Sequence, residues 1–489
     1  MNRPIRSLAI VILALVIALM ANASYVQFVR ADSLNAMNGN KRVINDQFAR
    51  ERGPILVAGE VVAESVPIDS EFKFQRTYYD HELYGKVSGY FSYIFGRGAI
   101  ENSYNDVLSG SDDRLIVTRF TDLLSNKQPR GGSVELTIDP AAQKAAQAGL
   151  AKLGKQTKGA VVAIDPKSGA ILAMVDRPTY DPNDLASHDF ESTEDVWEQL
   201  QSDPNQPMLN RGTQLVLPPG STFKLVTAAS AIENLGLKPD DKVKAGKELT
   251  FPGIKYTLRN SGGGNCGGNE ITFQQALVVS CNVSFGWLAG EVGQDNLQSM
   301  AEAFGFETKT FNDLPTAISR FTASPGVELE APQLAQSGIG QFEVAASPLQ
   351  MAMVASGIAN GGKVMAPYVV KAVRAPNLSV LEIGNPETQS EPISTQTANY
   401  LTQMMVATVD KGTARSAKIS GISVAGKTGT AQSAKDRAPY AWFVAFAPAN
   451  NPQVAVAVLV EASKGVGEVS GGRIAGPIAK SVMEAVINK

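Results

Sequence analysis

A serine and a lysine lie one helical turn apart at the start of a strongly apolar segment. A Pro-Pro-Gly turn signal stands directly before Ser221, and Lys224 follows three residues later. Residues 225–235 are mostly apolar and are followed by Gly236, which predicts a buried helix with a glycine C-cap. On such a helix the Ser221 and Lys224 side chains share one face, with Cβ atoms about 5–6 Å apart.

This position is unusual for a lysine with a purely structural role. The first turn of a helix favours anions, and burial also disfavours a charged ammonium group. A neutral amine beside a hydroxyl is a general base beside a nucleophile, so Ser221 is predicted to form a covalent intermediate. The alternative is a serine N-cap with a lysine that reaches solvent. The spacing alone does not decide, because Ser70 and Lys73 repeat it in a strand-like run without a helix start.

A second pattern joins Ser280 to Asn282, directly after the apolar stretch 273–279. Taken alone a Ser-x-Asn triplet is weak evidence, because Ser33 and Asn35 have the same spacing. Its value depends on whether the fold brings Ser280 and Asn282 to the serine–lysine pair.

The third pattern is Lys-Thr-Gly-Thr at 427–430, and Lys-Thr-Gly occurs once in the chain. It lies in a strand-like run, 422–432, where glycine lets a ligand approach the backbone. The Lys427 amine, the hydroxyls of Thr428 and Thr430 and the backbone N–H groups beside Gly429 suit an acyl substrate that ends in a carboxylate.

Composition argues against several other functions. The 489 residues suggest two to four domains at about 150 residues each. Lys and Arg number 44 against 47 Asp and Glu, without a basic stripe, so no nucleic-acid partner is expected. The two histidines, His81 and His188, lie in polar contexts that predict solvated side chains, which disfavours a Ser-His-Asp triad. No histidine or cysteine pair has zinc-site spacing, so we expect neither metal nor cofactor.

The N-terminal segment, residues 1–30, predicts a cytoplasmic tail and a membrane anchor. Arg3 and Arg6 precede residues 8–29, which contain no charged side chain. About 20 apolar residues span a bilayer, and the basic flank places the rest of the chain outside the cytoplasm. A signal peptide cleaved near 21–23 is the alternative. We favour the uncleaved anchor because the apolar run continues past that site.

The rest of the chain divides into a small module, 31–145, and a larger domain, 146–489. In the larger domain, 159–175 predicts a β-hairpin around a turn with proline and glycine. Helical patterns then fill 221–362, where strand patterns are absent. Strands are predicted again at 422–432, 440–447 and 454–461, before a terminal helix at 475–487. Strands at both ends of a helical middle predict an α+β fold with one antiparallel sheet.

Together and in this order, the three patterns match the S-x-x-K, S-D-N and K-T-G set of β-lactamases and penicillin-binding proteins, with Cys281 at the central position of the second. Over about 150–489 the chain resembles class B penicillin-binding proteins, the D,D-transpeptidase family, and specifically their actinobacterial A type. The supporting segments are 159–175, 217–224, 337–341, 348–352, 359–362 and 425–432, with a thinner likeness at 52–55 and 96–101. No region of glycosyltransferase size precedes them, so a bifunctional class A protein is not expected.

The resemblance implies a transpeptidase domain with a five-stranded antiparallel sheet and a helical subdomain, behind a pedestal-like or dimerisation module. It implies an enzyme that cross-links peptidoglycan stem peptides ending in D-Ala-D-Ala and that β-lactams inhibit covalently. The implied partners are a SEDS-type glycosyltransferase and other wall-synthesis proteins. The implied location is the cytoplasmic membrane, with the catalytic domain outside the cytoplasm.

The resemblance also implies the catalytic roles. Ser221 attacks the carbonyl of the penultimate D-Ala, and Lys224 takes its proton. Ser280 relays a proton toward the leaving amine, and Lys427 tunes the electrostatic field at Ser280. Asn282 holds the peptide backbone and helps to place Lys224.

For substrate binding, the resemblance assigns the terminal carboxylate to the hydroxyls of Thr428 and Thr430, on either side of Gly429. The backbone N–H groups of Ser221 and Thr430 would form the oxyanion hole.

Other functions compete with this interpretation. Residues 421–428 satisfy the P-loop pattern, but they are strand-like and no helical run follows. A serine β-lactamase shares all three patterns but needs an activated water, and we identify no clear carboxylate base for it. A penicillin sensor or non-catalytic scaffold is disfavoured by the complete residue set.

Cys266 and Cys281 would face an oxidising compartment in this topology. A disulfide between them would close a loop of about 15 residues, stabilise the fold by about 3 kcal/mol and brace Ser280. Two reduced thiols, with Cys281 buried in the core, are the alternative. The sequence leaves this choice open because it gives no Cα–Cα distance.

Overall fold

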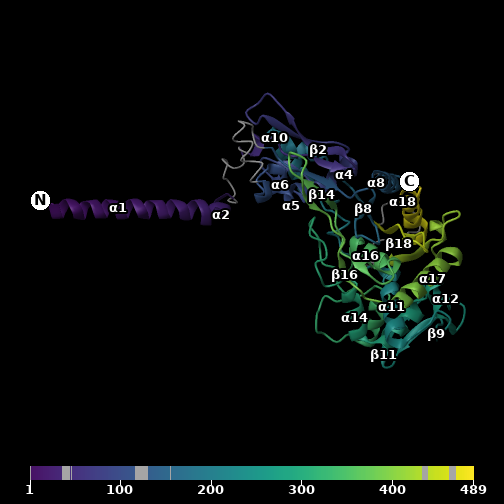
Figure 1. The fold of residues 1–489 in the computed structure, drawn as a ribbon. Coiled ribbons are helices and arrows are strands. Elements are labelled where there is room, and N and C mark those ends of the chain that lie inside the picture. Colours follow the sequence, from purple (N-terminus) through teal and green to yellow (C-terminus); the bar gives the residue numbers. More distant parts are fainter. Residues whose placement is uncertain are drawn as a thin grey trace.

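The structure, a computed structural model, describes residues 2–35, 45, 47–115, 130–154, 156–431, 439–461 and 470–488. Helix α1 (Asn2–Ser24) continues into a π-helical turn, Tyr25–Val29, and projects away from the rest of the chain (Figure 1). The most apolar 18-residue window of the span Arg3–Val29 has a mean hydropathy of 2.4, and this window is not buried in the protein. Its length and exposed apolar surface are compatible with a single-pass anchor.

Distant parts of the chain form one five-stranded antiparallel sheet in the order β17-β18-β19-β7-β8. Its strands are β7 (Lys158–Ile164), β8 (Ile171–Arg177), β17 (Ala425–Ala431), β18 (Tyr440–Ala447) and β19 (Val454–Glu461). The expected α+β fold, with a sheet assembled from both ends of a domain, is confirmed. The last residue of the predicted strand 422–432, Gln432, lies outside the described residues.

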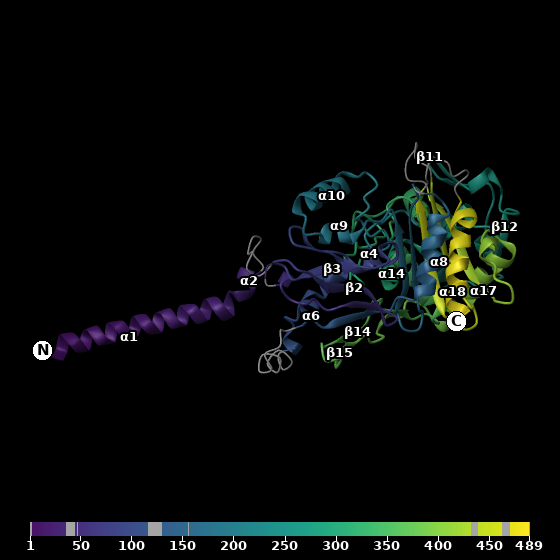
Figure 2. The same cartoon turned by 90° about the horizontal axis from the view of Figure 1, so that it is seen from above.

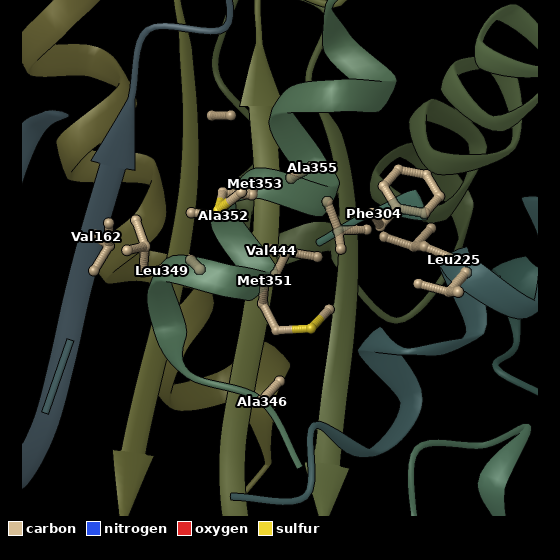
Figure 3. Close-up of a cluster of buried hydrophobic side chains, with 14 of the residues drawn as sticks. Val162, Leu225, Phe304, Ala346, Leu349, Met351, Ala352, Met353, Ala355 and Val444 are labelled. Carbon is tan, nitrogen blue, oxygen red and sulfur yellow. The ribbon is translucent and has the colours of Figure 1, made fainter. Parts of the chain in front are cut away.

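Helices cover both faces of this sheet, which explains the nearly continuous apolar runs in β18 and β19. On one face α8 (Pro140–Ala151) and α18 (Gly476–Ile487) lie side by side (Figure 2). On the other face lies α16 (Pro348–Ala359), whose apolar side chains pack with Val162 of β7 and Val444 of β18 (Figure 3).

Much of the segment between the two halves of the sheet forms the helical subdomain. Its helices are α11 (Lys224–Leu235), α12 (Phe273–Val278), α13 (Asn282–Val292), α14 (Gln294–Ala303), α15 (Ala331–Ser337) and α17 (Thr395–Lys411). The prediction that this stretch lacks strands is wrong. Four short strands pair there, β9 (Lys242–Lys244), β10 (Glu248–Phe251), β11 (Ile254–Arg259) and β12 (Glu270–Thr272). They have few buried residues, so their sequence carries no clear inward–outward alternation.

A second sheet of six strands lies in the N-terminal module, in the order β15-β14-β6-β1-β2-β3. Four strands come from the module itself, β1 (Ile55–Val57), β2 (Glu60–Pro67), β3 (Phe74–Tyr78) and β6 (Ser133–Leu136). The other two, β14 (Val370–Arg374) and β15 (Val380–Ile383), come from much later in the chain and were not predicted. β14 pairs directly with β6, so the later segment completes the module's sheet.

Further helices and strands lie elsewhere in the described structure. They are α2 (Ala31–Asn35), α4 (His81–Ser88), α5 (Ala99–Ser103), α6 (Asn105–Ser109), α9 (Pro182–Ala186), α10 (Phe190–Ser202), β4 (Phe91–Ser92), β5 (Gly96–Arg97), β13 (Val364–Met365) and β16 (Thr388–Ser390). A buried ion pair joins Lys86 of α4 to Asp176 of β8, with Nζ and Oδ1 3.2 Å apart. Both side chains are almost fully buried, so removing either one would leave the other charge buried without this partner.

Candidate active site

Ser221 lies in a 3₁₀ turn, Gly220–Thr222, directly before α11. Gly220 has a φ of 54°, and its N–H donates a 2.9 Å hydrogen bond to Gly340 O. A Cβ on Gly220 would lie 2.8 Å from Thr430 O, so a glycine is needed for the turn to pack this closely on β17. The turn therefore holds Ser221 beside the Lys-Thr-Gly-Thr strand.

Lys224 is completely buried at the start of α11. Its Nζ donates to Ser280 O at 2.8 Å, to Asn282 Oδ1 at 2.7 Å and, more weakly, to Ser280 Oγ at 3.3 Å. Burial, and then the nearby charge of Lys427, place the pKa of Lys224 well below the usual lysine value. Among the described residues no hydrogen bond joins Lys224 Nζ to Ser221 Oγ, although both groups lie in the same turn of chain.

Ser280 connects the two buried lysines. It lies between α12 and α13 with a φ of 59°, a left-handed conformation that is uncommon for a residue with a Cβ. Its Oγ accepts a 2.8 Å hydrogen bond from Lys427 Nζ in addition to the contact from Lys224. Burial lowers the pKa of Lys427 to about 7. A hydroxyl between two amines of lowered pKa can pass a proton in either direction.

The residues around Ser280 fix its loop. Asn282 begins α13, and its Nδ2 donates to Arg259 O at 2.9 Å while its Oδ1 holds Lys224. Cys281 forms a disulfide with Cys266, with the Cα atoms 5.8 Å apart. The bridge answers the question that the sequence left open, and it ties the Ser280 loop to the glycine-rich segment 261–268.

The Lys-Thr-Gly-Thr pattern lies on β17, which stands at the edge of the five-stranded sheet and pairs with β18. Side chains alternate between the two faces of a strand, so Lys427 and Gly429 share one face of β17 and Thr428 and Thr430 share the other. Both threonines line the cleft beside Ser221. Thr428 Oγ1 lies 2.8 Å from Thr413 Oγ1. A Cβ on Gly429 would lie 2.9 Å from Pro219 O, which explains the glycine at this position.

Two cavities meet at Ser221 and Thr430. The first, about 620 Å³, is lined by Ser280, Thr428 and residues of two later loops. The second, about 370 Å³, extends past Asn282. An extended substrate can therefore lie along β17 with its reacting carbonyl at Ser221 and one part in each cavity.

Several residues of the first cavity escaped the sequence analysis, and three of them carry polar or charged side chains of particular interest. Thr413 follows α17, Arg415 lies in a short 3₁₀ turn, and Arg473 precedes α18. None belongs to a recognisable spacing pattern. The glycine pair at 471–472 is the kind of sequence feature that indicates close backbone packing. In the structure a Cβ on Gly471 would lie 2.5 Å from Gly429 O, so this segment packs directly on β17.

The predicted solvated state of the histidines is wrong for His188. This side chain is half-buried against the rings of Phe48 and Phe72, and its Nε2 has no hydrogen-bond partner among the described atoms. The apolar contacts come from residues distant in sequence, which its polar neighbours did not reveal. His81 is partly exposed, 3.4 Å from Asp181 Oδ2, and neither histidine lines the two cavities.

The competing motifs are not supported by their surroundings. Ser70 and Lys73 lie in and next to an exposed turn between β2 and β3, whereas the sequence suggested a strand. Residues 425–431 form a strand paired with β18, so Lys427 does not start a helix as a P-loop requires. No group of three or more metal-ligating side chains occurs within the described ranges.

Comparisons with known proteins agree along the whole chain. The family model of the penicillin binding protein transpeptidase domain matches residues 159–484, and that of the penicillin binding protein A dimerisation domain matches 52–134. The chain is 39% identical over 494 residues to the peptidoglycan D,D-transpeptidase PbpA of Mycolicibacterium smegmatis, covering all of both chains. It is 38% identical over 492 residues to the Mycobacterium tuberculosis protein of that name, covering 100% of this chain and 99% of the relative.

Solved structures give the same result for the fold. The ceftriaxone acyl-enzyme complex of penicillin-binding protein A from M. tuberculosis superposes with a TM-score of 0.86 at 38% identity, over 91% of this chain and 100% of that one. The imipenem acyl-enzyme complex of the same protein gives 0.84, over 90% and 99% of the two chains.

Proposed function

We propose a residue-level mechanism from the premise that this chain belongs to the penicillin-binding protein transpeptidase family. The chain is a peptidoglycan D,D-transpeptidase, a serine acyl transferase that reacts covalently with β-lactams. The observation that carries the mechanism is the convergence of Lys224, Ser280 and Lys427 in the cleft that contains Ser221. We assign residues 1–30 to the anchor, 31–145 to the N-terminal module and 146–489 to the transpeptidase domain.

In the first half-reaction Ser221 Oγ bonds to the carbonyl carbon of the penultimate D-Ala, and its proton passes to Lys224. The lowered pKa of Lys224 leaves its amine free to accept that proton. The C–N bond to the terminal D-Ala then breaks, and the leaving nitrogen receives a proton through Ser280. The hydrogen bonds from Lys224 and Lys427 to Ser280 Oγ give this proton a continuous route.

The two cavities divide the substrate between them. Thr428 and Thr430 line the first cavity and bind the terminal carboxylate there. The acyl part lies in the second cavity, where Asn282 contacts the peptide backbone. The N–H groups of Ser221 and Thr430 form the oxyanion hole, in which loss of one donor costs about 10²–10³ in rate.

In the second half-reaction an amine of a neighbouring stem peptide attacks the ester on Ser221. A C–N bond forms, the C–Oγ bond breaks, and the amine's proton returns to Ser221 Oγ. A β-lactam acylates Ser221 in the same way as the first half-reaction. Its leaving amine stays covalently attached to the acyl group after the ring opens, and the acyl-enzyme therefore accumulates.

We also place residues 8–29 across the cytoplasmic membrane, with the catalytic domain outside the cytoplasm. The exposed apolar helix and its basic flank support this topology. The N-terminal module, which matches a dimerisation-domain model, is the surface we assign to a SEDS-type glycosyltransferase and other wall-synthesis proteins. Protease accessibility of residues 47–489 in intact spheroplasts tests the topology, and protection of this region would contradict it.

Activity is tested with a donor peptide ending in D-Ala-D-Ala and an amine acceptor. We expect one D-Ala released for each new amide bond formed, and slow turnover of nitrocefin. Rapid nitrocefin hydrolysis without amide formation would instead identify a β-lactamase.

A further inference from the structure

The first cavity carries positive charge that the proposed catalytic residues do not use. Arg415 and Arg473 line it together with Thr428, and no aspartate or glutamate is among its lining residues. Both arginines are exposed to solvent. The wall can therefore attract an anion that enters the cavity from solution.

The two arginines come from different segments that are joined to each other. Arg415 lies in the 3₁₀ turn Arg415–Ala417 and Arg473 in the π-helical turn Gly471–Ala475. Ser416 Oγ donates a hydrogen bond to Gly472 O and so connects the turns. Arg415 Nη2 donates to Lys411 O at 2.8 Å, and in the described part of the chain neither guanidinium has a carboxylate partner.

The chemistry of the reaction indicates which anion this wall meets. The leaving group, D-Ala, carries its amine and its carboxylate on the same carbon. By microscopic reversibility, an acceptor amine attacks the acyl-enzyme from the position that the leaving amine occupied. The substituent beside the acceptor's amine then lies in the first cavity, which Thr428, Arg415 and Arg473 line.

We propose that Arg415 and Arg473 form an anion subsite that selects acceptors with a carboxylate on the amine-bearing carbon. The inference rests on the proposed acyl-enzyme at Ser221. In the selected step the acceptor nitrogen bonds to the acyl carbon, the C–Oγ bond breaks and the nitrogen's proton passes to Ser221 Oγ. The arginines touch only the acceptor's carboxylate, so they bias the choice of acceptor without entering the bond changes.

The experiment isolates the second half-reaction by using a donor without a terminal carboxylate. An N-acyl-D-alanine thioester of a neutral thiol acylates the full-length protein in detergent, and D-alanine competes with D-alaninamide as acceptor. The ratio of the two amide products is measured by mass spectrometry for wild type, Arg415→Gln, Arg473→Gln and Arg473→Lys. Lys418→Gln is the matched control, because Lys418 pairs with Asp410 and does not line the cavity.

We expect wild type to prefer D-alanine. Each glutamine variant should lower the ratio of the D-alanine product to the D-alaninamide product by roughly 3- to 10-fold, as expected for charges that solvent partly screens. Arg473→Lys should retain part of the preference, Lys418→Gln all of it, and added salt should reduce it in wild type. Thiol release in the absence of acceptor should be equal in all five proteins. An unchanged product ratio in both glutamine variants, with normal thiol release, would overturn the subsite, whereas absent thiol release in wild type would overturn the proposed function.

Discussion

Lys427 Nζ and Ser280 Oγ lie 2.8 Å apart and join the edge strand β17 to the loop between α12 and α13. The same hydroxyl lies 3.3 Å from Lys224 Nζ. Burial lowers the pKa of both lysines, and the nearby charge of Lys427 lowers the pKa of Lys224 further. The two amines, bridged by the Ser280 hydroxyl, therefore form a coupled pair in which protonation of one amine opposes protonation of the other.

The pH dependence of acylation follows from this coupling. The pKa of Lys427 is about 7, so this side chain is charged below that pH and neutral above it. A charged Lys427 attracts the substrate's carboxylate, so the second-order rate constant for benzylpenicillin should fall as the pH rises above about 7. Arginine keeps its charge, so Lys427→Arg should lack this decline, as rate profiles between about pH 5 and 10 will show. The same alkaline decline in Lys427→Arg would mean that another group titrates.

Removal of the Lys224 amine should nearly abolish acylation. A general base contributes about 10²–10⁴-fold to such a step, and Lys224→Ala should slow acylation by that factor. Stopped-time mass spectrometry measures the rate, and thermal unfolding checks that the variant is folded. Lys418→Ala, which removes an exposed lysine, should acylate normally. An acylation rate near that of wild type in Lys224→Ala would assign the base to a different group.

A negative charge beside Lys224 should shift its titration. Asn282 Oδ1 accepts a 2.7 Å hydrogen bond from Lys224 Nζ, so Asn282→Asp places a carboxylate against the amine. The carboxylate favours the protonated amine and raises the pKa of Lys224. Relative to wild type, acylation should therefore be slowest at neutral pH and should approach the wild-type rate as the pH rises. Asn282→Ala is the control that loses the same hydrogen bond without adding charge, and a similar recovery there would refute the electrostatic explanation.

The disulfide should stabilise the fold and hold Ser280 in place. The bridge joins residues 15 apart, and in the chain-entropy model its loss costs about 3 kcal/mol of unfolding free energy. Replacing both Cys266 and Cys281 by serine should lower the stability by about this amount. It should also slow acylation, because Ser280 directly precedes Cys281. Denatured protein without reductant should show no titratable thiol, and two thiols would contradict the bridge.

The sequence analysis succeeded where the signal is local. The helix after Ser221 ends at Gly236 as predicted, and the strands at 440–447 and 454–461 have the predicted bounds, because long apolar runs between turns define them. Ser280 and Asn282 were selected through a spacing pattern and do meet Lys224.

The sequence was insufficient where tertiary packing makes the site. Arg415 and Arg473 reach the cleft from loops that are far apart in the sequence and are joined by a hydrogen bond from Ser416 to Gly472 O. β14 joins the N-terminal sheet across more than 200 residues of chain, a pairing that no local pattern encodes. His188 was misjudged because its aromatic neighbours are distant in sequence.

Peptide mapping of the benzylpenicillin adduct tests the central claim most directly. The full-length protein is acylated, digested and analysed by mass spectrometry beside Ser221→Ala. We predict a single adduct on the peptide that contains Ser221, and none in the variant. An adduct on Ser70, or labelling that persists in Ser221→Ala, would contradict the account.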